Sequence, residues 1–233
     1  MLEVEVKLKA NIDDLWPKLN ALGFLASAPI YEKDIYFNSG QNDLKASDKA
    51  LRIREFKDYD CDETAFLLNF KGPKVDEKTM TRQETEFAIP SFKDGYTLLS
   101  GLGFEPAGQV EKTREYFHKG NITVCLDRVT NLGEFVEVEI LTEDLPQGGI
   151  GGRLTDSGLA ADQSTDTGLA ANQSTDTELA ANQSTDSGLA ADRSDSPYRM
   201  ALAQIEDLLL TLGLSMDDTI RESYLCMLQK KSD

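Results

Sequence analysis

Charged and aliphatic residues alternate at the start of the chain. Glu3, Glu5 and Lys7 are each flanked by leucine or valine. Successive side chains of a β-strand point to opposite faces, so these three charges share one face. Similar runs place further charges along the chain. The cations are Lys7, Arg52, Arg54, Lys71, Arg82, Lys112 and Arg114, and the anions are Glu3, Glu5, Glu84, Glu86, Asp127, Glu137 and Glu139.

These residue types indicate two kinds of chemistry. Cations held in fixed geometry suit phosphate oxygens, and an arginine can bind two of them at once. Carboxylates clustered without cysteine or histidine suit the hard ions Mg²⁺ and Mn²⁺. The single histidine, His118, is interpreted as a strand surface residue rather than a catalytic base.

Period-two alternation predicts the strands that position these charges. They cover residues 2–9, 34–37, 50–56, 65–71, 81–89, 113–119, 122–128 and 135–141. Helical patterns cover residues 13–22, 92–102, 198–212 and 217–228. The fold class is therefore α+β, a closed eight-stranded antiparallel β-barrel, or tunnel, with helices packed outside.

The direction of the charged faces has two interpretations. Each face could simply point to water while the apolar faces form the core. The helices, however, carry apolar stripes that need a sheet surface to cover, and this turns the charges into the lumen. Packing them dry would cost several kcal/mol per ion, so we expect a wet lumen occupied by counter-charge.

An internal echo supports a sheet that closes on itself. Leu22-Gly23-Phe24 ends one helical pattern and Leu102-Gly103-Phe104 ends another, 80 residues later. A Tyr-Phe pair follows each glycine after the same interval, at residues 36–37 and 116–117. Two similar halves predict a pseudo-symmetric barrel.

Overall composition excludes several classes of function. The 233 residues carry a formal net charge of −17, which disfavours binding to nucleic acid or to an anionic membrane surface. Cys61, Cys125 and Cys226 are far apart, so neither a disulfide framework nor a zinc site is expected. No signal peptide or membrane-spanning run is recognisable, and we expect a cytoplasmic protein.

Residues 155–194 consist of four tandem decapeptides, TDSGLAADQS, TDTGLAANQS, TDTELAANQS and TDSGLAADRS. One leucine in ten residues cannot supply the continuous apolar stripe of a solenoid. We therefore predict a disordered insertion over residues 146–196. It would interrupt a single domain formed by residues 1–145 and 197–233.

Glu3-x-Glu5-x-Lys7 resembles the ExExK signature of the CYTH superfamily, the triphosphate tunnel metalloenzymes. Further family motifs follow in order, and the resemblance covers residues 1–145 and 198–228. They are ALRIRE (50–55), NFKGP (69–73), TRQETEF (81–87), EKTREYF (111–117) and LDRVTNLGEFVEVEI (126–140). The insertion is a departure, because the link to the C-terminal helices is normally short in this family.

The resemblance implies a role for each charged residue. Triphosphate would be held by Lys7, Arg52, Arg54, Lys71, Arg82, Lys112 and Arg114, all of which except Arg82 are also catalytic candidates. Mg²⁺ or Mn²⁺ would be held by Glu3, Glu5, Glu137 and Glu139, with Asp127 as a further ligand candidate. Glu84 and Glu86 would belong to the acidic shell.

Three functions stay open at this point. DIYF followed by ASDKALRIRE, and the terminal DDTIRESYLCML, resemble the class IV adenylate cyclase branch. That branch converts ATP to cyclic AMP and pyrophosphate. The alternatives are an inorganic or thiamine triphosphatase that releases orthophosphate, and a non-catalytic module that binds polyphosphate or nucleotide. The expected partner is a small-molecule triphosphate, without nucleic acid or membrane, and a homodimer is left open.

Overall fold

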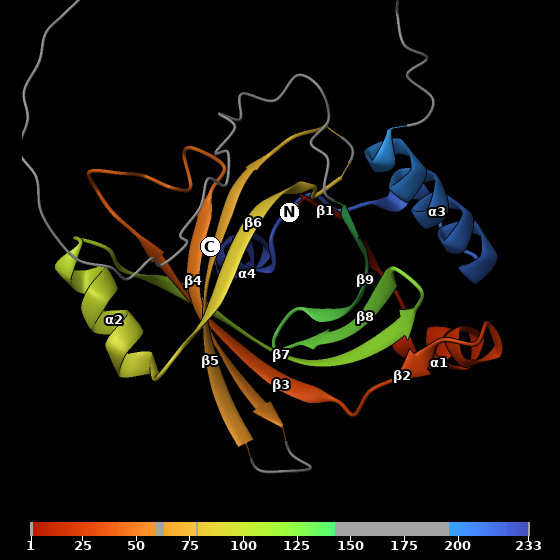
Figure 1. Ribbon diagram of the computed structural model, residues 1–233, viewed down its shortest axis with the longest axis horizontal. Helices are drawn as coiled ribbons and strands as arrows, with labels where there is room; N and C mark the ends of the chain where they lie inside the picture. Colours follow the sequence, from red (N-terminus) through yellow and green to blue (C-terminus); the bar gives the residue numbers. More distant parts are fainter. Residues whose placement is uncertain (1, 59–62, 78, 143–195, 233) are drawn as a thin grey trace, which may run out of the picture.

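A computed structural model describes residues 2–58, 63–77, 79–142 and 196–232. Its strands surround a central tunnel (Figure 1). The strands are β1 Leu2–Lys9, β2 Leu25–Ala26, β3 Ile30–Asn38, β4 Ala50–Asp58, β5 Glu63–Lys74, β6 Arg82–Ile89, β7 Glu105–Lys119, β8 Ile122–Val129 and β9 Gly133–Thr142. The helices are α1 Ile12–Ala21, α2 Phe92–Gly101, α3 Pro197–Leu212, the 3₁₀ turn η2 Met216–Asp218, and α4 Tyr224–Ser232.

Eight of these strands close into a ring. The order is β7-β3-β4-β5-β6-β1-β9-β8, and β8 pairs back with β7. Every neighbouring pair is antiparallel. The predicted closed eight-stranded barrel is thus confirmed. The short strand β2 was not predicted; it pairs with the end of β7, outside the ring order.

The ring has a pseudo-twofold symmetry that relates the two halves of the chain. Exchanging β1 with β6, β3 with β7, β4 with β8 and β5 with β9 reproduces the same order of strands. Each half begins with a strand and a helix, and both helices end at a glycine with positive φ. Gly23 has a φ of +81° and Gly103 a φ of +83°, a region that only glycine adopts without strain. The repeat seen in the sequence is therefore a repeat of structure.

Helices cover the apolar outer face of the barrel. The aliphatic residues of β1 are buried with Leu19 of α1 and with Ile205 and Leu209 of α3 in one cluster. Each such residue, when fully buried, contributes roughly 1.5–3 kcal/mol to folding. Since one face of β1 is covered in this way, its charged face must point into the tunnel. The sheet alternation and the helical stripes therefore determine together which side chains reach the lumen.

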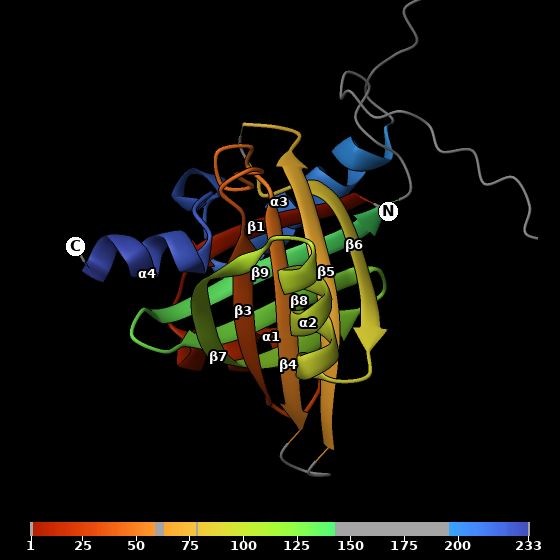
Figure 2. The ribbon, with the colours of Figure 1, turned by 90° about the vertical axis from the view of Figure 1, so that its left-hand side faces the viewer.

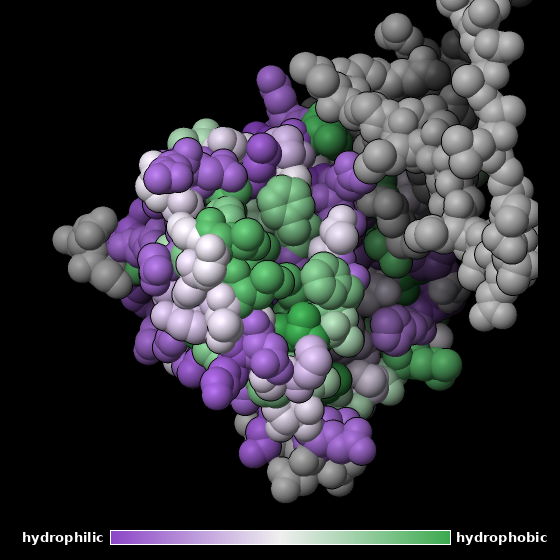
Figure 3. Space-filling model, turned by 60° about the vertical axis from the view of Figure 1, so that its left-hand side comes forward, coloured by the Kyte–Doolittle hydropathy of each residue, from purple (hydrophilic) through white to green (hydrophobic). Residues whose placement is uncertain are grey.

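Helix α2 covers the other side of the barrel. Leu99 is buried against Ile53 and Leu68, while Leu98 and Leu102 on the outer side are more than half exposed. The side of the molecule that carries α2 is turned forward in Figure 3, and apolar side chains gather in the middle of that view.

The C-terminal segment closes one end of the tunnel and differs from the prediction. The sequence favours one helix over residues 217–228, whereas the structure has a 3₁₀ turn, an irregular connection and then α4. The amide of Ile220 donates to the carbonyl of Lys7 at 2.7 Å, and the Arg221 guanidinium donates to the carbonyls of Asp76 and Thr79. These bonds hold the segment against the barrel in a non-helical conformation. Helix α4 therefore begins only at Tyr224. Figure 2 shows α4 projecting from that end.

The predicted insertion lies outside the described residues, apart from its last residue, so its disorder and its boundaries stay predictions. No helix in the described ranges is both long and apolar enough to cross a membrane.

Candidate active site

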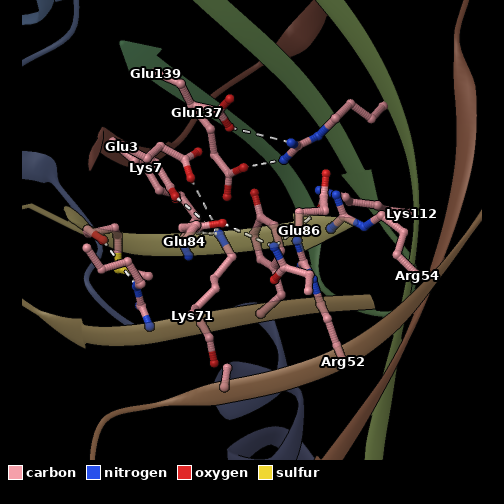
Figure 4. Close-up of a pocket in the computed structure, with 18 of the residues that line it drawn as sticks. Glu3, Lys7, Arg52, Arg54, Lys71, Glu84, Glu86, Lys112, Glu137 and Glu139 are labelled. Atoms are coloured by element: carbon pink, nitrogen blue, oxygen red, sulfur yellow. Dashed lines mark hydrogen bonds and ion pairs between the residues drawn. The ribbon is translucent and has the colours of Figure 1, made fainter. Parts of the chain in front are cut away.

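The tunnel encloses a cavity of about 490 Å³. All seven predicted cations and six of the seven predicted anions line it; the exception is Asp127. These side chains come from six different strands, so only the closed barrel brings them together (Figure 4). A volume in this range suits a small organic ligand.

Three carboxylates form a tight cluster in this cavity. One oxygen each from Glu3, Glu5 and Glu84 lies within 4.8 Å of the other two. Burial raises the pKa of Glu3 and that of Glu5, and neighbouring carboxylates raise them further, while Lys71 works in the opposite direction. A divalent cation would compensate this concentration of negative charge. The donor set, oxygen alone, fits Mg²⁺ or Mn²⁺.

Lys71 reaches this cluster from β5. Its ammonium nitrogen is 3.9 Å from Oε2 of Glu3 and 3.9 Å from Oε2 of Glu5, and it forms a closer ion pair with Glu84. Burial disfavours the charged amine, but the three carboxylates outweigh burial and raise the pKa of Lys71. Lys71 is therefore a fully charged group among the carboxylates.

Glu137 and Glu139 of β9 lie beside Arg114. Arg114 forms a close ion pair with Glu137, and its Nη1 is 3.5 Å from Oε1 of Glu139. Burial works against ionisation of Glu137, but Arg114, Lys112 and Lys7 prevail and lower its pKa. For Glu139 burial prevails over Arg114 and, with Glu5 and Glu137, raises the pKa to about 7. The two acids of one strand therefore differ in how readily they ionise, Glu137 more readily than Glu139.

An acidic pair on β3 was missed by the sequence analysis. Asp34 accepts from Arg54 at 2.6 and 2.8 Å and from Arg52 at 2.8 Å. Glu32 lies 3.0 Å from Arg54 and 3.3 Å from Lys112, and it accepts from the Tyr116 hydroxyl at 2.7 Å. Both acids are almost fully buried. They neutralise and orient the cations of this wall.

Asp127 has the same function on the adjacent strand pair β7–β8, which comes from the second half of the chain. Its oxygens accept from Nε and Nη2 of Arg114, both at 2.6 Å, from Lys112 at 3.0 Å and from the Tyr224 hydroxyl at 2.9 Å. Arg114 faces Asp127 in the sheet register as Asp34 faces Arg54. The pseudo-twofold therefore relates two bidentate ion pairs of reversed polarity.

Two cations in the cavity lack a carboxylate partner among the described residues. Lys7 is buried with its ammonium 4.5 Å from the centre of the Tyr224 ring, and burial lowers its pKa. Within the described part of the chain, Arg82 donates to the carbonyls of Met80 and Gly72. Both are suited to receive an anion from outside the protein.

Several uncharged side chains also line the tunnel, among them Tyr36, Phe56, Tyr116 and Leu141. The sequence offered no signal for them, because aromatic and aliphatic residues in strands usually belong to a core. They give the cavity apolar surface beside its charges.

The sequence of this chain matches a known family and several known proteins. The family model described as CYTH domain matches residues 1–151. A Methanocaldococcus jannaschii protein named "Putative adenylate cyclase" is 35% identical over 148 residues, which span 62% of this chain and 80% of the relative. Adenylate cyclase CyaB of Aeromonas hydrophila is 26% identical over 144 residues, which span 60% of this chain and 70% of the relative.

Solved structures share the architecture. A Pyrococcus horikoshii protein aligns with a TM-score of 0.69 and 27% identity, covering 98% of this chain and 99% of its own. A Vibrio parahaemolyticus protein described as a "putative adenylate cyclase" aligns with a TM-score of 0.66 over 98% of both chains. Its identity of 19% shows likeness of fold alone.

Proposed function

The chain belongs to the CYTH domain family, and from this we propose that it is a divalent-metal-dependent enzyme that acts on a triphosphate inside the tunnel. One observation carries the proposal: seven cations and a three-carboxylate cluster line a single cavity. A triphosphate carries several negative charges that lysine and arginine can bind, and a metal ion held by the carboxylates would offset the acidic side of the same cavity.

We assign the cations to the phosphate chain according to how they are held. Lys7 and Arg82 form no ion pair with a carboxylate among the described residues, so both can donate to phosphate oxygens. Arg52, Arg54, Lys112 and Arg114 are oriented by buried acids and present fixed donors. Donors held rigidly in a low-dielectric site stabilise developing charge without having to reorganise.

We assign the metal to Glu3, Glu5 and Glu84, with Glu137 and Glu139 as further ligand candidates on the same side of the cavity. Such a metal would neutralise phosphate charge and polarise the reacting phosphoryl group. Glu84 enters this set on its distance to Glu3 and Glu5. We do not retain Asp127, because Arg114, Lys112 and Tyr224 already occupy its oxygens.

We propose cyclisation of ATP as the reaction. The ribose 3′ oxygen would form a bond to the α-phosphorus, and the bond to the bridging oxygen would break. Pyrophosphate would leave with the electron pair, and the 3′ proton would be released. The names of two relatives support this reaction, and so do the aromatic side chains of the tunnel, which offer a nucleoside more apolar contact than inorganic triphosphate can use.

A substrate panel tests this proposal. The purified full chain is incubated with ATP, inorganic triphosphate or thiamine triphosphate, each with Mg²⁺, with Mn²⁺ or with a chelator. We expect metal-dependent turnover of ATP that exceeds turnover of the other two compounds. Faster cleavage of inorganic or thiamine triphosphate would replace the cyclase by a triphosphatase, and binding without turnover would leave a binding module.

A further inference from the structure

One amine contacts the whole candidate metal cluster. In Figure 4, Lys71 extends from β5 toward Glu3 and Glu84. Its nitrogen lies 3.9 Å from an oxygen of Glu3, 3.9 Å from an oxygen of Glu5, and closer to one of Glu84. These are the same three carboxylates whose oxygens approach within 4.8 Å of one another. Lys71 therefore occupies the environment that a metal ion would use.

A metal ion and this ammonium group cannot share the cluster. Mg²⁺ binds carboxylate oxygens at about 2.0–2.1 Å, which would bring the ion close to the Lys71 nitrogen. Two positive charges at such a separation repel strongly in a buried site, where little solvent screens them. The four-carbon stem of lysine is flexible, so the amine can turn away when an ion arrives.

Once the Lys71 ammonium group has turned away from the three carboxylates, it needs another anionic partner. Lys71 lies opposite Ala50 of β4 in the sheet register, and its charge is close enough to Arg52 to be repelled by it. The acids on the Arg52 side, Asp34 and Glu32, are already paired with arginine and with Lys112. A phosphate chain in the cavity would supply the missing partner.

We infer that Lys71 exchanges partners on binding and thereby couples the affinity for metal to the affinity for triphosphate. Without triphosphate, Lys71 holds the carboxylates and weakens metal binding. With triphosphate, its ammonium moves to phosphate and leaves the carboxylates to the metal. The coupling is reciprocal, because each ligand must change the affinity for the other by the same factor. The inference rests on the proposed function and adds to it a coupling between the binding of metal and the binding of triphosphate.

Metal affinity, measured without turnover, tests this inference. Free Mn²⁺ is followed by electron paramagnetic resonance at mildly alkaline pH, with and without a triphosphate analogue whose bridging oxygens are replaced by carbon. Binding of Mn²⁺ to the analogue alone is measured separately and subtracted. For the wild-type chain we expect the analogue to tighten Mn²⁺ binding by about tenfold or more.

Substitutions at Lys71 separate the amine from its surroundings. Lys71→Met should bind Mn²⁺ about tenfold more tightly than wild type without the analogue, and the analogue should add little. Lys71→Arg keeps the charge and should behave as wild type. Lys33→Met is the matched control, because Lys33 pairs with Glu111 at 4.0 Å and does not line the cavity. Thermal melting verifies the fold, and Lys71→Gln replaces Lys71→Met if the latter does not fold.

The outcomes distinguish this inference from the proposed function. Equal or weaker Mn²⁺ affinity in folded Lys71→Met, beside clear binding by wild type, would overturn the inference and leave the metal site standing. The same holds if the analogue does not change the affinity of wild type. Failure of wild type and all variants to bind Mn²⁺ even with the analogue would overturn both.

Discussion

Arg54 and Arg114 illustrate how single residues organise the tunnel. Each forms a bidentate ion pair with one aspartate across the sheet, Arg54 with Asp34 and Arg114 with Asp127. The planar guanidinium fork fits a carboxylate in this way and is fixed by it. Further donors of each guanidinium reach other acids of the tunnel, Glu32 from Arg54 and Glu137 and Glu139 from Arg114.

The role of Asp127 can be separated from metal binding. Asp127→Asn keeps the shape of the side chain but removes the charge that orients Arg114 and Lys112. We expect turnover to fall by about 100-fold, the loss typical of misplaced groups in a site, while Mn²⁺ affinity stays the same. Kinetics together with Mn²⁺ titration check this. Weaker binding of Mn²⁺ by Asp127→Asn than by wild type would return Asp127 to the set of metal ligands.

Glu32 should make stability depend on pH. Burial opposes ionisation of this carboxyl, but Arg54, Lys112 and Arg114 outweigh burial and lower its pKa in the folded state. The carboxylate therefore stabilises the fold above its unfolded pKa of about 4.3, and this contribution is lost as pH falls toward the folded pKa.

Glu32→Gln should accordingly lower the free energy of unfolding by roughly 1–3 kcal/mol at neutral pH. The difference from wild type should shrink progressively as the pH falls below about 4, where the carboxyl of the unfolded chain takes up its proton while the folded one stays ionised. Denaturant unfolding of wild type and of Glu32→Gln, at neutral pH and again below about pH 4, measures this difference in the free energy of unfolding. A difference that is equal at both values would mean that packing, not charge, is responsible.

Sequence reasoning found the charged residues that line the cavity but not the buried acids Glu32 and Asp34 that pair with them. Alternation with aliphatic neighbours revealed residues such as Glu5 and Arg54. Around β3 the run Glu32-Lys33-Asp34 is charged on both faces, so the period of two disappears and the predicted strand begins only at residue 34. Only the pairing with β4 and β7 shows which of these charges point inward.

At the level of secondary structure, the internal repeat was the most informative signal. It predicted two equivalent halves, and the strand exchange of the ring shows them. The C-terminal helix was the least predictable element, because its start depends on bonds that Ile220 and Arg221 make to the barrel far away in sequence. Local propensity carries no information about such contacts.

Packing of α2 on the barrel can be tested at its two glycines. A Cβ on Gly95 would lie 2.5 Å from Cδ1 of Ile89 and 2.8 Å from Cδ1 of Ile53, whereas a Cβ on Gly101 would meet nothing within 4 Å. Gly95→Ala should therefore destabilise the fold by roughly 1–3 kcal/mol. Gly101→Ala should be neutral or stabilising by up to about 1 kcal/mol, since alanine restricts the unfolded chain. Thermal melts compare the stability of the two variants with that of wild type. Equal changes in melting temperature would refute close docking of α2 on the barrel.

At the scale of the whole molecule, the four decapeptides are expected to be dispensable. They carry seven acids and one arginine, a net charge of −6, and little apolar surface. Shortening a flexible connection changes its closure free energy by only about 0.6 kcal/mol per halving of length. Deletion of residues 155–194 should therefore leave the melting temperature and turnover nearly unchanged. A large loss of either would mean that the repeats pack on the tunnel or control access to it.

Charge balance across the whole molecule explains why a strongly acidic protein can bind a polyanion. Seven cations line the cavity beside six carboxylates, where strands from both halves meet, so the excess of acids lies elsewhere in the chain. Net charge alone argues against such a ligand, whereas local charge supports it. The central claim is that the bound triphosphate is ATP and that it is cyclised.

The most direct measurement is the identity of the product formed from ATP. The full chain is incubated with ATP labelled in its adenine and, separately, in its terminal phosphate, in the presence of Mg²⁺ or Mn²⁺, and the products are separated. We predict cyclic AMP from the first label and pyrophosphate from the second, with equal yields and no product when metal is chelated. Orthophosphate from the terminal label, with ADP from the adenine label, would contradict the cyclase and identify the protein as a triphosphatase.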